Sequence, residues 1–309
     1  MKIFIDTAKL EEIKEALSWG IVDGVTTNPS LIRAAIEDER EKGREVTLAD
    51  YVAEVCRMAG EGRPVSLEVL SQTSARMIEE ARTLYARFNP IARNVVIKIP
   101  VNTYMGEETA TDYEGLKAIN ELGKQIPINA TLVMAPEQAL LAAKARATYV
   151  SPFAGRVDDY IRENLGISFE KYDYFDFDLV RKIAREELDK LLKNSASSEI
   201  SSVYSDEKVR KTRDIGENEG IISGDLVRKV VAVFRKYDVK TKVIAASMRN
   251  PRQVREVAEA GADIATIPFE VLQAMLKHPK TEEGVKKFYV DAIRANYQEL
   301  FSRGTGRQR

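Results

Sequence analysis

A lysine stands near the end of a strongly apolar run, Val95–Pro100. The β-branched residues of this run predict a buried strand of a parallel sheet, which ends near the proline. Burial disfavours the ammonium form of a lysine, and the neutral amine can attack a ketone or an aldehyde to form a Schiff base. Taken alone, Lys98 could equally reach solvent from the strand end or pair with a carboxylate.

Polar residues recur near the ends of successive apolar runs, as Lys98 does. They are Asp6, Thr26, Asn28, Glu68, Asn129, Thr131, Ser151, Ser247 and Arg249, with Phe153 two positions after Ser151. Single cases have ordinary explanations: Asp6 could cap a helix, Asn28 could form a turn, and Glu68 could only neutralise Lys98. These explanations do not account for the recurrence on successive strands, which favours a common site.

Two of these polar residues, together with Arg156, indicate an anion site. Arg156 and Arg249 offer planar sets of donors that suit a phosphate, and the Ser247 hydroxyl adds another donor. Arginines are common in this chain, and Arg156 could equally lie in a surface turn. The combination favours a phosphorylated substrate.

The elements that must position these residues alternate along the whole chain. Apolar runs at 2–6, 24–27, 65–69, 95–99, 126–131, 148–152, 242–246 and 264–267 predict strands. Amphipathic segments at 10–19, 48–60, 74–88, 113–123, 136–145, 224–237, 252–260 and 270–277 predict helices. Eight such units indicate a closed (β/α)8 barrel, whose sites lie at the carboxyl ends of the strands. A doubly wound open sheet is the weaker alternative, because no glycine-rich dinucleotide turn follows the first strand.

We expect residues 1–309 to form a single barrel domain with two insertions and an additional C-terminal helix near 283–301. The first insertion, 102–112, follows the strand of Lys98, and we expect it to form a rim of the site with Tyr104 as a contact. The second, 166–220, follows strand six and contains an apolar helical stripe at 180–191. We expect this helix to pack on the outer wall of the barrel or on a neighbouring subunit.

Composition excludes several classes of function. The 47 basic and 48 acidic residues nearly balance, so no overall field favours nucleic acid or a membrane. Cys56 is the only cysteine and His278 the only histidine, which rules out an intramolecular disulfide and imidazole catalysis. Chemistry must therefore use lysine, carboxylates and hydroxyls. The sequence starts directly with a predicted strand and shows no signal peptide, so we expect a cytoplasmic protein.

The motifs together resemble the transaldolase family, Schiff-base enzymes on a (β/α)8 barrel. The matching stretches are FIDTA at 4–8, DGVTTNPSLI at 23–32, VSLEV at 65–69, VIKIP at 96–100, NATL at 129–132, SPFAGR at 151–156, ASMR at 246–249 and DIATIP at 263–268. The resemblance covers nearly the whole chain apart from the two insertions.

The resemblance implies a role for each matching residue. Lys98 would form the Schiff base with the ketose carbonyl, and Asp6 would take the proton from the C4 hydroxyl. Glu68 and Thr131 would transfer protons through a held water. The other residues would hold the substrate: Thr26, Asn28, Asn129 and Ser151 the dihydroxyacetone unit, and Arg156, Ser247 and Arg249 the phosphate. No metal and no cofactor is implied.

The resemblance also separates two branches of the family. In fructose-6-phosphate aldolase a glutamine usually replaces the glutamate and a tyrosine replaces the phenylalanine, so Glu68 and Phe153 side with transaldolase. We expect dihydroxyacetone transfer from sedoheptulose 7-phosphate or fructose 6-phosphate to an aldose phosphate, in the pentose phosphate pathway. The alternatives are an aldolase that releases dihydroxyacetone and a non-catalytic barrel that binds phosphosugars. Expected partners are phosphorylated sugars and further copies of the chain, in a homo-oligomer.

Overall fold

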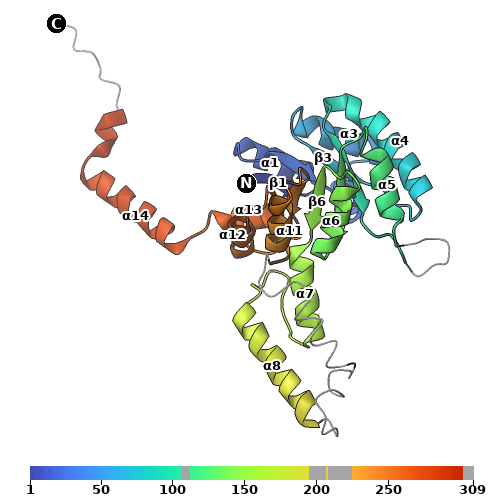
Figure 1. Ribbon diagram of the computed structural model, residues 1–309. Coiled ribbons are helices and arrows are strands. Elements are labelled where there is room, and N and C mark those ends of the chain that lie inside the picture. The colour runs from blue at the N-terminus through green and yellow to red at the C-terminus, as the bar shows by residue number, and fades with distance from the viewer. Residues whose placement is uncertain (106–111, 195–206, 208–224, 302–309) are drawn as a thin grey trace.

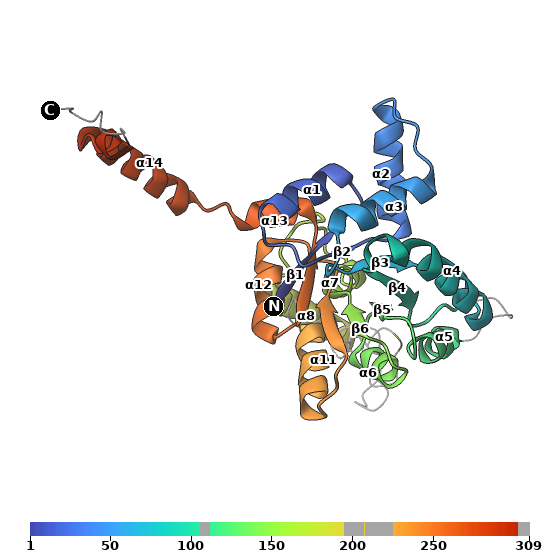
Figure 2. The same cartoon turned by 90° about the horizontal axis from the view of Figure 1, so that it is seen from above.

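Eight parallel strands close into a barrel in the computed structural model, which describes residues 1–105, 112–194, 207 and 225–301. Each strand pairs with its neighbour in chain order, and β1 closes the barrel against β8 (Figures 1 and 2). The strands are β1 Lys2–Asp6, β2 Gly24–Thr26, β3 Val65–Glu68, β4 Val95–Pro100, β5 Ile128–Val133, β6 Tyr149–Pro152, β7 Lys242–Ala245 and β8 Ile264–Ile267. The expected (β/α)8 barrel is confirmed.

Helices surround the barrel and connect the strands. They are α1 Leu10–Ser18, α2 Pro29–Glu41, α3 Leu48–Ala59, α4 Ser74–Ala92, α5 Glu114–Leu122, α6 Pro136–Lys144, α7 Ala154–Asn164, α8 Phe177–Asn194, α11 Asp225–Lys236, α12 Pro251–Ala260, α13 Phe269–Met275 and α14 Pro279–Arg294. Two of them, α2 and α7, were not expected from the sequence. At the start of α2, Asn28 caps the helix by accepting the Leu31 N–H at 2.9 Å, and Pro29 takes the first helical position. The segment read as a possible turn is therefore a helix start.

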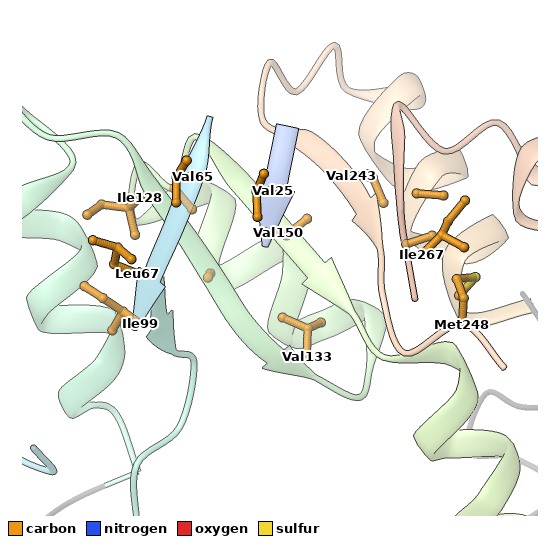
Figure 3. Packing of buried hydrophobic residues seen from close by; sticks show 14 of the residues in the cluster. Val25, Val65, Leu67, Ile99, Ile128, Val133, Val150, Val243, Met248 and Ile267 are labelled. Atoms are coloured by element: carbon orange, nitrogen blue, oxygen red, sulfur yellow. The ribbon is translucent and has the colours of Figure 1, made fainter. Parts of the chain in front are cut away.

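The strands alternate between an outer face that packs on the helices and an inner face that points into the barrel. Apolar side chains such as Val25, Leu67 and Ile99 belong to the large buried cluster between strands and helices (Figure 3). Side chains alternate along a strand between its two faces. The residues next to these in the sequence, Thr26, Glu68 and Lys98, therefore face inward.

The interior has an apolar lower part and a polar upper part. Phe4, Ile244 and Ile264 form a separate buried cluster, with Tyr149 packed against it. Gly24 leaves room for this cluster, since a Cβ there would lie 2.6 Å from the Phe4 ring. The cluster fills the amino-terminal end of the barrel, so polar inward residues gather at the carboxyl end.

Two helices extend away from the barrel. Helix α8, which carries the predicted stripe, leaves from the end that bears α7, and α14 projects outward on its own (Figures 1 and 2). Among the stripe residues of α8 whose side chains the structure describes, Val180 at the start is buried, and Ile183, Ala184 and Leu188 are partly exposed. The predicted C-terminal helix is in two pieces, α14 and a short 3-10 helix at Tyr297–Phe301, because Asn296 between them takes a left-handed backbone conformation (φ 53°).

Some predicted features lie outside the described residues. They are most of the first insertion (106–111), most of the serine-rich and charged parts of the second (195–206 and 208–224) and the last residues of the chain (302–309). Within the described part, no helix is both long and apolar enough to cross a bilayer.

Candidate active site

The predicted site residues converge on one cavity of about 370 Å³ at the carboxyl ends of the strands. Its lining includes Asp6, Thr26, Asn28, Lys98, Asn129, Thr131, Ser151, Phe153, Arg156, Ser247 and Arg249. Of the predicted catalytic and substrate-binding residues, only Glu68 is absent from this lining, and its carboxylate instead contacts the Lys98 amine. Residues that are far apart in the sequence therefore share one site, as the recurrence on strand ends predicted.

Lys98 is buried, with 5% of its surface exposed, and has two partners. Its Nζ donates to the carbonyl oxygen of Thr27 at 3.0 Å and lies 3.1 Å from Oε2 of Glu68. The strand register places Glu68 beside Lys98 on adjacent strands, so the pair follows directly from the pairing of β3 with β4. The lysine therefore pairs with a carboxylate and also lines the cavity.

Asp6 lies across the cavity from this pair, at the end of β1. Its Oδ1 accepts a hydrogen bond from the Thr26 hydroxyl at 2.7 Å, and that hydroxyl also contacts Thr266 of β8. Desolvation by burial raises the pKa of Asp6 above its usual value, although the Thr26 hydrogen bond and the nearby charge of Lys98 oppose the shift. An aspartate with a raised pKa is a better proton acceptor when ionised.

The polar wall between Lys98 and β6 is formed by buried hydroxyl and amide groups. Ser151 donates to Oδ1 of Asn129 at 2.6 Å, which directs the Asn129 amide nitrogen toward the Ser66 hydroxyl at 3.5 Å. The Thr131 hydroxyl oxygen is buried without a hydrogen-bond partner among the described residues. A buried hydroxyl without a protein partner suits a contact with substrate or with a bound water.

The predicted anion site lies where β6 and β7 end. Ser247 has a left-handed backbone conformation (φ 65°), and a Cβ on Gly155 would lie 2.0 Å from its carbonyl oxygen. This close approach brings the start of α7, with Arg156, against the end of β7, with Arg249. Arg249 donates through Nη2 to Asp159 at 2.8 Å, while its Nε is buried without a partner in the described structure. The guanidinium of Arg156 lies 5.3 Å from the centre of the Phe153 ring.

The cavity also contains residues that were not predicted as site residues. Thr266, Lys171 and Glu270 belong to its lining, whereas Tyr104, the expected rim contact, does not and is 50% exposed. Thr266 could have been identified from the sequence, because it is a polar residue at an inward position of an apolar strand. Lys171 could not, since its place in the cavity lining depends on how the second insertion folds back.

Two carboxylates, a buried amine and several hydroxyls at the mouth of a barrel define a class of enzyme that works with lysine and carboxylate chemistry. Within the described residues, no three or more histidine, cysteine, aspartate or glutamate side chains are grouped so that they could hold a metal ion. The chain belongs to the transaldolase/fructose-6-phosphate aldolase family, whose model matches residues 3–308.

Relatives named probable transaldolase support this assignment over almost the whole chain. The protein of Caldicellulosiruptor saccharolyticus is 42% identical over 293 residues, which cover 94% of this chain and 96% of the relative. Those of Thermoplasma volcanium and Thermus thermophilus are 37% and 36% identical over 292 residues, covering 94% of this chain and 95% and 97% of the relatives. The expectation of a transaldolase-family enzyme is confirmed.

The raised pKa of Asp6 predicts a cost in stability. The folded state holds the Asp6 proton more tightly than the unfolded state, so the free energy of unfolding falls as pH rises through the folded pKa. Asp6→Asn removes this titration. We expect the variant to be more stable than the wild type at pH 7, with a difference that shrinks as pH falls toward 4, measured by urea unfolding.

Asp38→Asn is the matched control, because its sign is opposite. The hydrogen bond from Lys42 lowers the pKa of Asp38, so this carboxylate stabilises the fold above its unfolded pKa. Its replacement should lower stability at pH 7, and the loss should fade as pH falls. An Asp6→Asn variant that is less stable than the wild type at pH 7 would contradict the assignment.

Proposed function

We propose that this enzyme transfers a dihydroxyacetone unit between phosphorylated sugars through a Schiff base on Lys98. The observation that carries the proposal is the Lys98 amine, which is buried at the cavity floor within 3.1 Å of the Glu68 carboxylate. Glu68 can accept a proton from the ammonium, which frees the amine to attack the C2 carbonyl of a ketose phosphate. The donors we propose are sedoheptulose 7-phosphate and fructose 6-phosphate, in the pentose phosphate pathway.

The proposed chemistry proceeds by imine formation, cleavage and transfer. Attack of the amine gives a carbinolamine, and loss of water from it gives an iminium; Glu68 and Thr131 move the protons through a held water. Asp6 then removes the C4 hydroxyl proton, the C3–C4 bond breaks, and its electron pair is taken up by the iminium to give an enamine. An aldose phosphate leaves. The enamine adds to the carbonyl carbon of a second aldose phosphate, whose oxygen takes the proton from Asp6. Hydrolysis of the resulting iminium releases the new ketose phosphate and frees the Lys98 amine.

The remaining polar residues are proposed to bind the substrate. Asn129, Ser151, Thr26 and Asn28 surround the cavity near Lys98 and would hold the dihydroxyacetone unit. Because the Asn28 oxygen accepts the Leu31 N–H, its amide nitrogen stays available as a donor to the sugar. Arg156, Ser247 and Arg249 would bind the phosphate, and the contact with Phe153 would orient the Arg156 guanidinium.

We also propose that the protein is a cytoplasmic homo-oligomer with a single domain over residues 1–309. The single cysteine is buried, and burial raises the pKa of its thiol to about 12, which leaves it unreactive in a reducing compartment. Helix α14 supports the oligomer: Val285, Phe288, Tyr289 and Ile293 form an apolar stripe along it, and all four are exposed.

A second copy of the chain is the partner we propose for this stripe. An exposed apolar stripe costs free energy in water in proportion to its area, about 25 cal/mol per Å². The barrel of another copy offers a matching surface, because an apolar groove runs between α2, α3 and α4. Its lining includes Ile32, Leu48, Val52, Leu84 and Phe88. Each copy would thus place its own α14 in the groove of a neighbour and bind a neighbour's α14 in its own groove.

The covalent role of Lys98 is tested by borohydride reduction in the presence of fructose 6-phosphate, followed by peptide mass mapping. We expect one adduct, on the peptide that contains Lys98. Lys98→Arg should abolish both the adduct and turnover, since arginine stays protonated and cannot form the imine.

Lys117→Arg is the matched control, because Lys117 also pairs with a glutamate, Glu114 at 2.7 Å, but lies on the outer surface. It should keep the wild-type rate and adduct. An adduct on another lysine, or turnover by Lys98→Arg, would make the proposed mechanism wrong.

We expect transfer of dihydroxyacetone rather than its release, because Glu68 and Phe153 are the residues typical of the transaldolase branch. With fructose 6-phosphate as donor and erythrose 4-phosphate as acceptor, sedoheptulose 7-phosphate should be the main product and free dihydroxyacetone a minor one, measured by chromatography. The double variant Glu68→Gln with Phe153→Tyr should increase the share of dihydroxyacetone. Rapid cleavage by the wild type that does not respond to the acceptor would assign the protein to the aldolase alternative.

The oligomer is tested by light scattering over a range of protein concentrations. Phe288→Asp places a charge in the apolar stripe of α14, so we expect its mass to fall to that of one chain while the wild type stays larger. Tyr237→Asp is the control, because Tyr237 is equally exposed but lies beyond the end of α11. A wild type with the mass of one chain would refute the proposal.

A further inference from the structure

The start of the second insertion returns to the mouth of the cavity. Residues 167–176 form this segment, which we call the inserted lip, and its contacts fix it on three sides. Arg162 of α7 and Asn250 before α12 donate to its backbone carbonyls at Asp173 and Tyr172. The Tyr172 hydroxyl donates to Glu270 of α13 at 2.6 Å. The lip is therefore part of the folded barrel, whereas α8 beyond it leads away.

Aromatic residues of the lip strengthen this attachment. The guanidinium of Arg252 lies 3.7 Å from the centre of the Tyr174 ring, and the hydroxyl of that tyrosine donates to Glu256. Phe175 is buried. These contacts join the lip to α12, the helix that follows Arg249, so the position of the lip is set relative to the anion site.

One carboxylate connects the lip to the anion site. Arg162 is buried, lies 3.8 Å from the centre of the Phe169 ring in the lip, and donates to Oδ1 of Asp159 at 3.0 Å. The other oxygen of Asp159 accepts from Arg249 at 2.8 Å. Asp159 thus fixes one edge of the Arg249 guanidinium and leaves its buried Nε without a partner in the described structure.

Lys171 brings a further positive charge to the lining of the cavity, which it shares with Arg156 and Arg249. Its ammonium donates to the Tyr172 hydroxyl at 3.3 Å and lies 4.9 Å from the centre of that ring. The side chain is exposed, so the ammonium can leave this weak contact for a bound anion. Glu270 is the acidic residue of the cavity lining that contacts the lip, and its carboxylate already accepts the Tyr172 hydroxyl. Three cations from α7, the segment after β7 and the insertion therefore line the same cavity, which Lys9 and Glu12 at the start of α1 also border.

We propose that the inserted lip is part of the phosphate-binding site: Lys171 contacts the phosphate directly, and Asp159, held by Arg162 beneath the lip, positions Arg249 for it. The inference rests on the proposed function, because it extends the phosphate site assigned there. It makes the insertion a determinant of selectivity for phosphorylated over unphosphorylated sugars.

The direct test measures binding of inorganic phosphate by calorimetry at low salt. Because a partly exposed charge contributes modestly, Lys171→Ala should weaken phosphate binding roughly three- to ten-fold, and Lys171→Glu should weaken it further. Lys171→Arg should restore binding to near the wild-type value. Lys182→Ala, which removes an exposed lysine from α8, is the matched control and should bind phosphate as the wild type does.

The second readout is selectivity. The ratio of kcat/KM for fructose 6-phosphate to that for fructose should fall about five-fold in Lys171→Ala. Asp159→Asn should lower the same ratio, and should do so through KM rather than kcat, since it acts on the position of Arg249. A merely structural role would lower both substrates' kcat/KM together and leave the ratio unchanged.

The outcomes separate this inference from the proposed function. If Lys171→Ala and Lys171→Glu bind phosphate as tightly as Lys182→Ala does, the inserted lip has no part in binding and the inference is wrong. Phosphate calorimetry needs no turnover, so a lysine effect without a borohydride adduct on Lys98 would overturn the covalent mechanism and leave the inference standing.

Discussion

The contact between Lys98 and Glu68 is the interaction on which the rest of the site depends. Removing two charges from water costs several kcal/mol for each ion, and the cost is offset only if the ions meet at close range with their remaining hydrogen bonds satisfied. The register of β3 against β4 provides that geometry, and the Thr27 carbonyl accepts a further hydrogen bond from the amine. Breaking the pair would leave one buried charge uncompensated.

The barrel interior makes this pair possible because its two ends differ. Phe4, Ile244 and Ile264 fill the amino-terminal end, so no polar group is needed there. Polar inward residues are therefore concentrated toward the carboxyl ends of the strands, where a cavity opens. In this polar layer, β1 and β3 supply the two carboxylates, β4 supplies the amine and β5 supplies the threonine. The arginines come from the segments that follow β6 and β7.

Much of the fold and of the site could be predicted from the sequence, because both follow from local periodicity. An inward residue is separated from the next by one outward apolar residue, which is why Asn129 and Thr131 could be assigned to one face. The start of α2 was not recognised, because an asparagine followed by proline favours both a turn and a helix cap.

The errors concern residues whose place depends on tertiary contacts. Lys171 reaches the cavity only because Tyr172, Tyr174 and Arg162 hold the inserted lip in place, and no pattern along the chain shows those partners. Tyr104 was expected at the rim because its segment leaves the strand of Lys98. In the structure Tyr104 is half exposed and does not belong to the cavity lining; Asn102 accepts its backbone N–H, and Thr103 donates to the Gln72 carbonyl.

Gly155 has a consequence for the evolution of this site. With the carbonyl of Ser247 only 2.0 Å from where a Cβ would lie, any side chain at this position must push the end of β7 away from α7. The spacing between the two arginines is thus fixed by the absence of an atom. Natural or laboratory selection for a substrate of different length must therefore change residues other than Gly155. In a mutant library that varies position 155, most variants would have a distorted anion site.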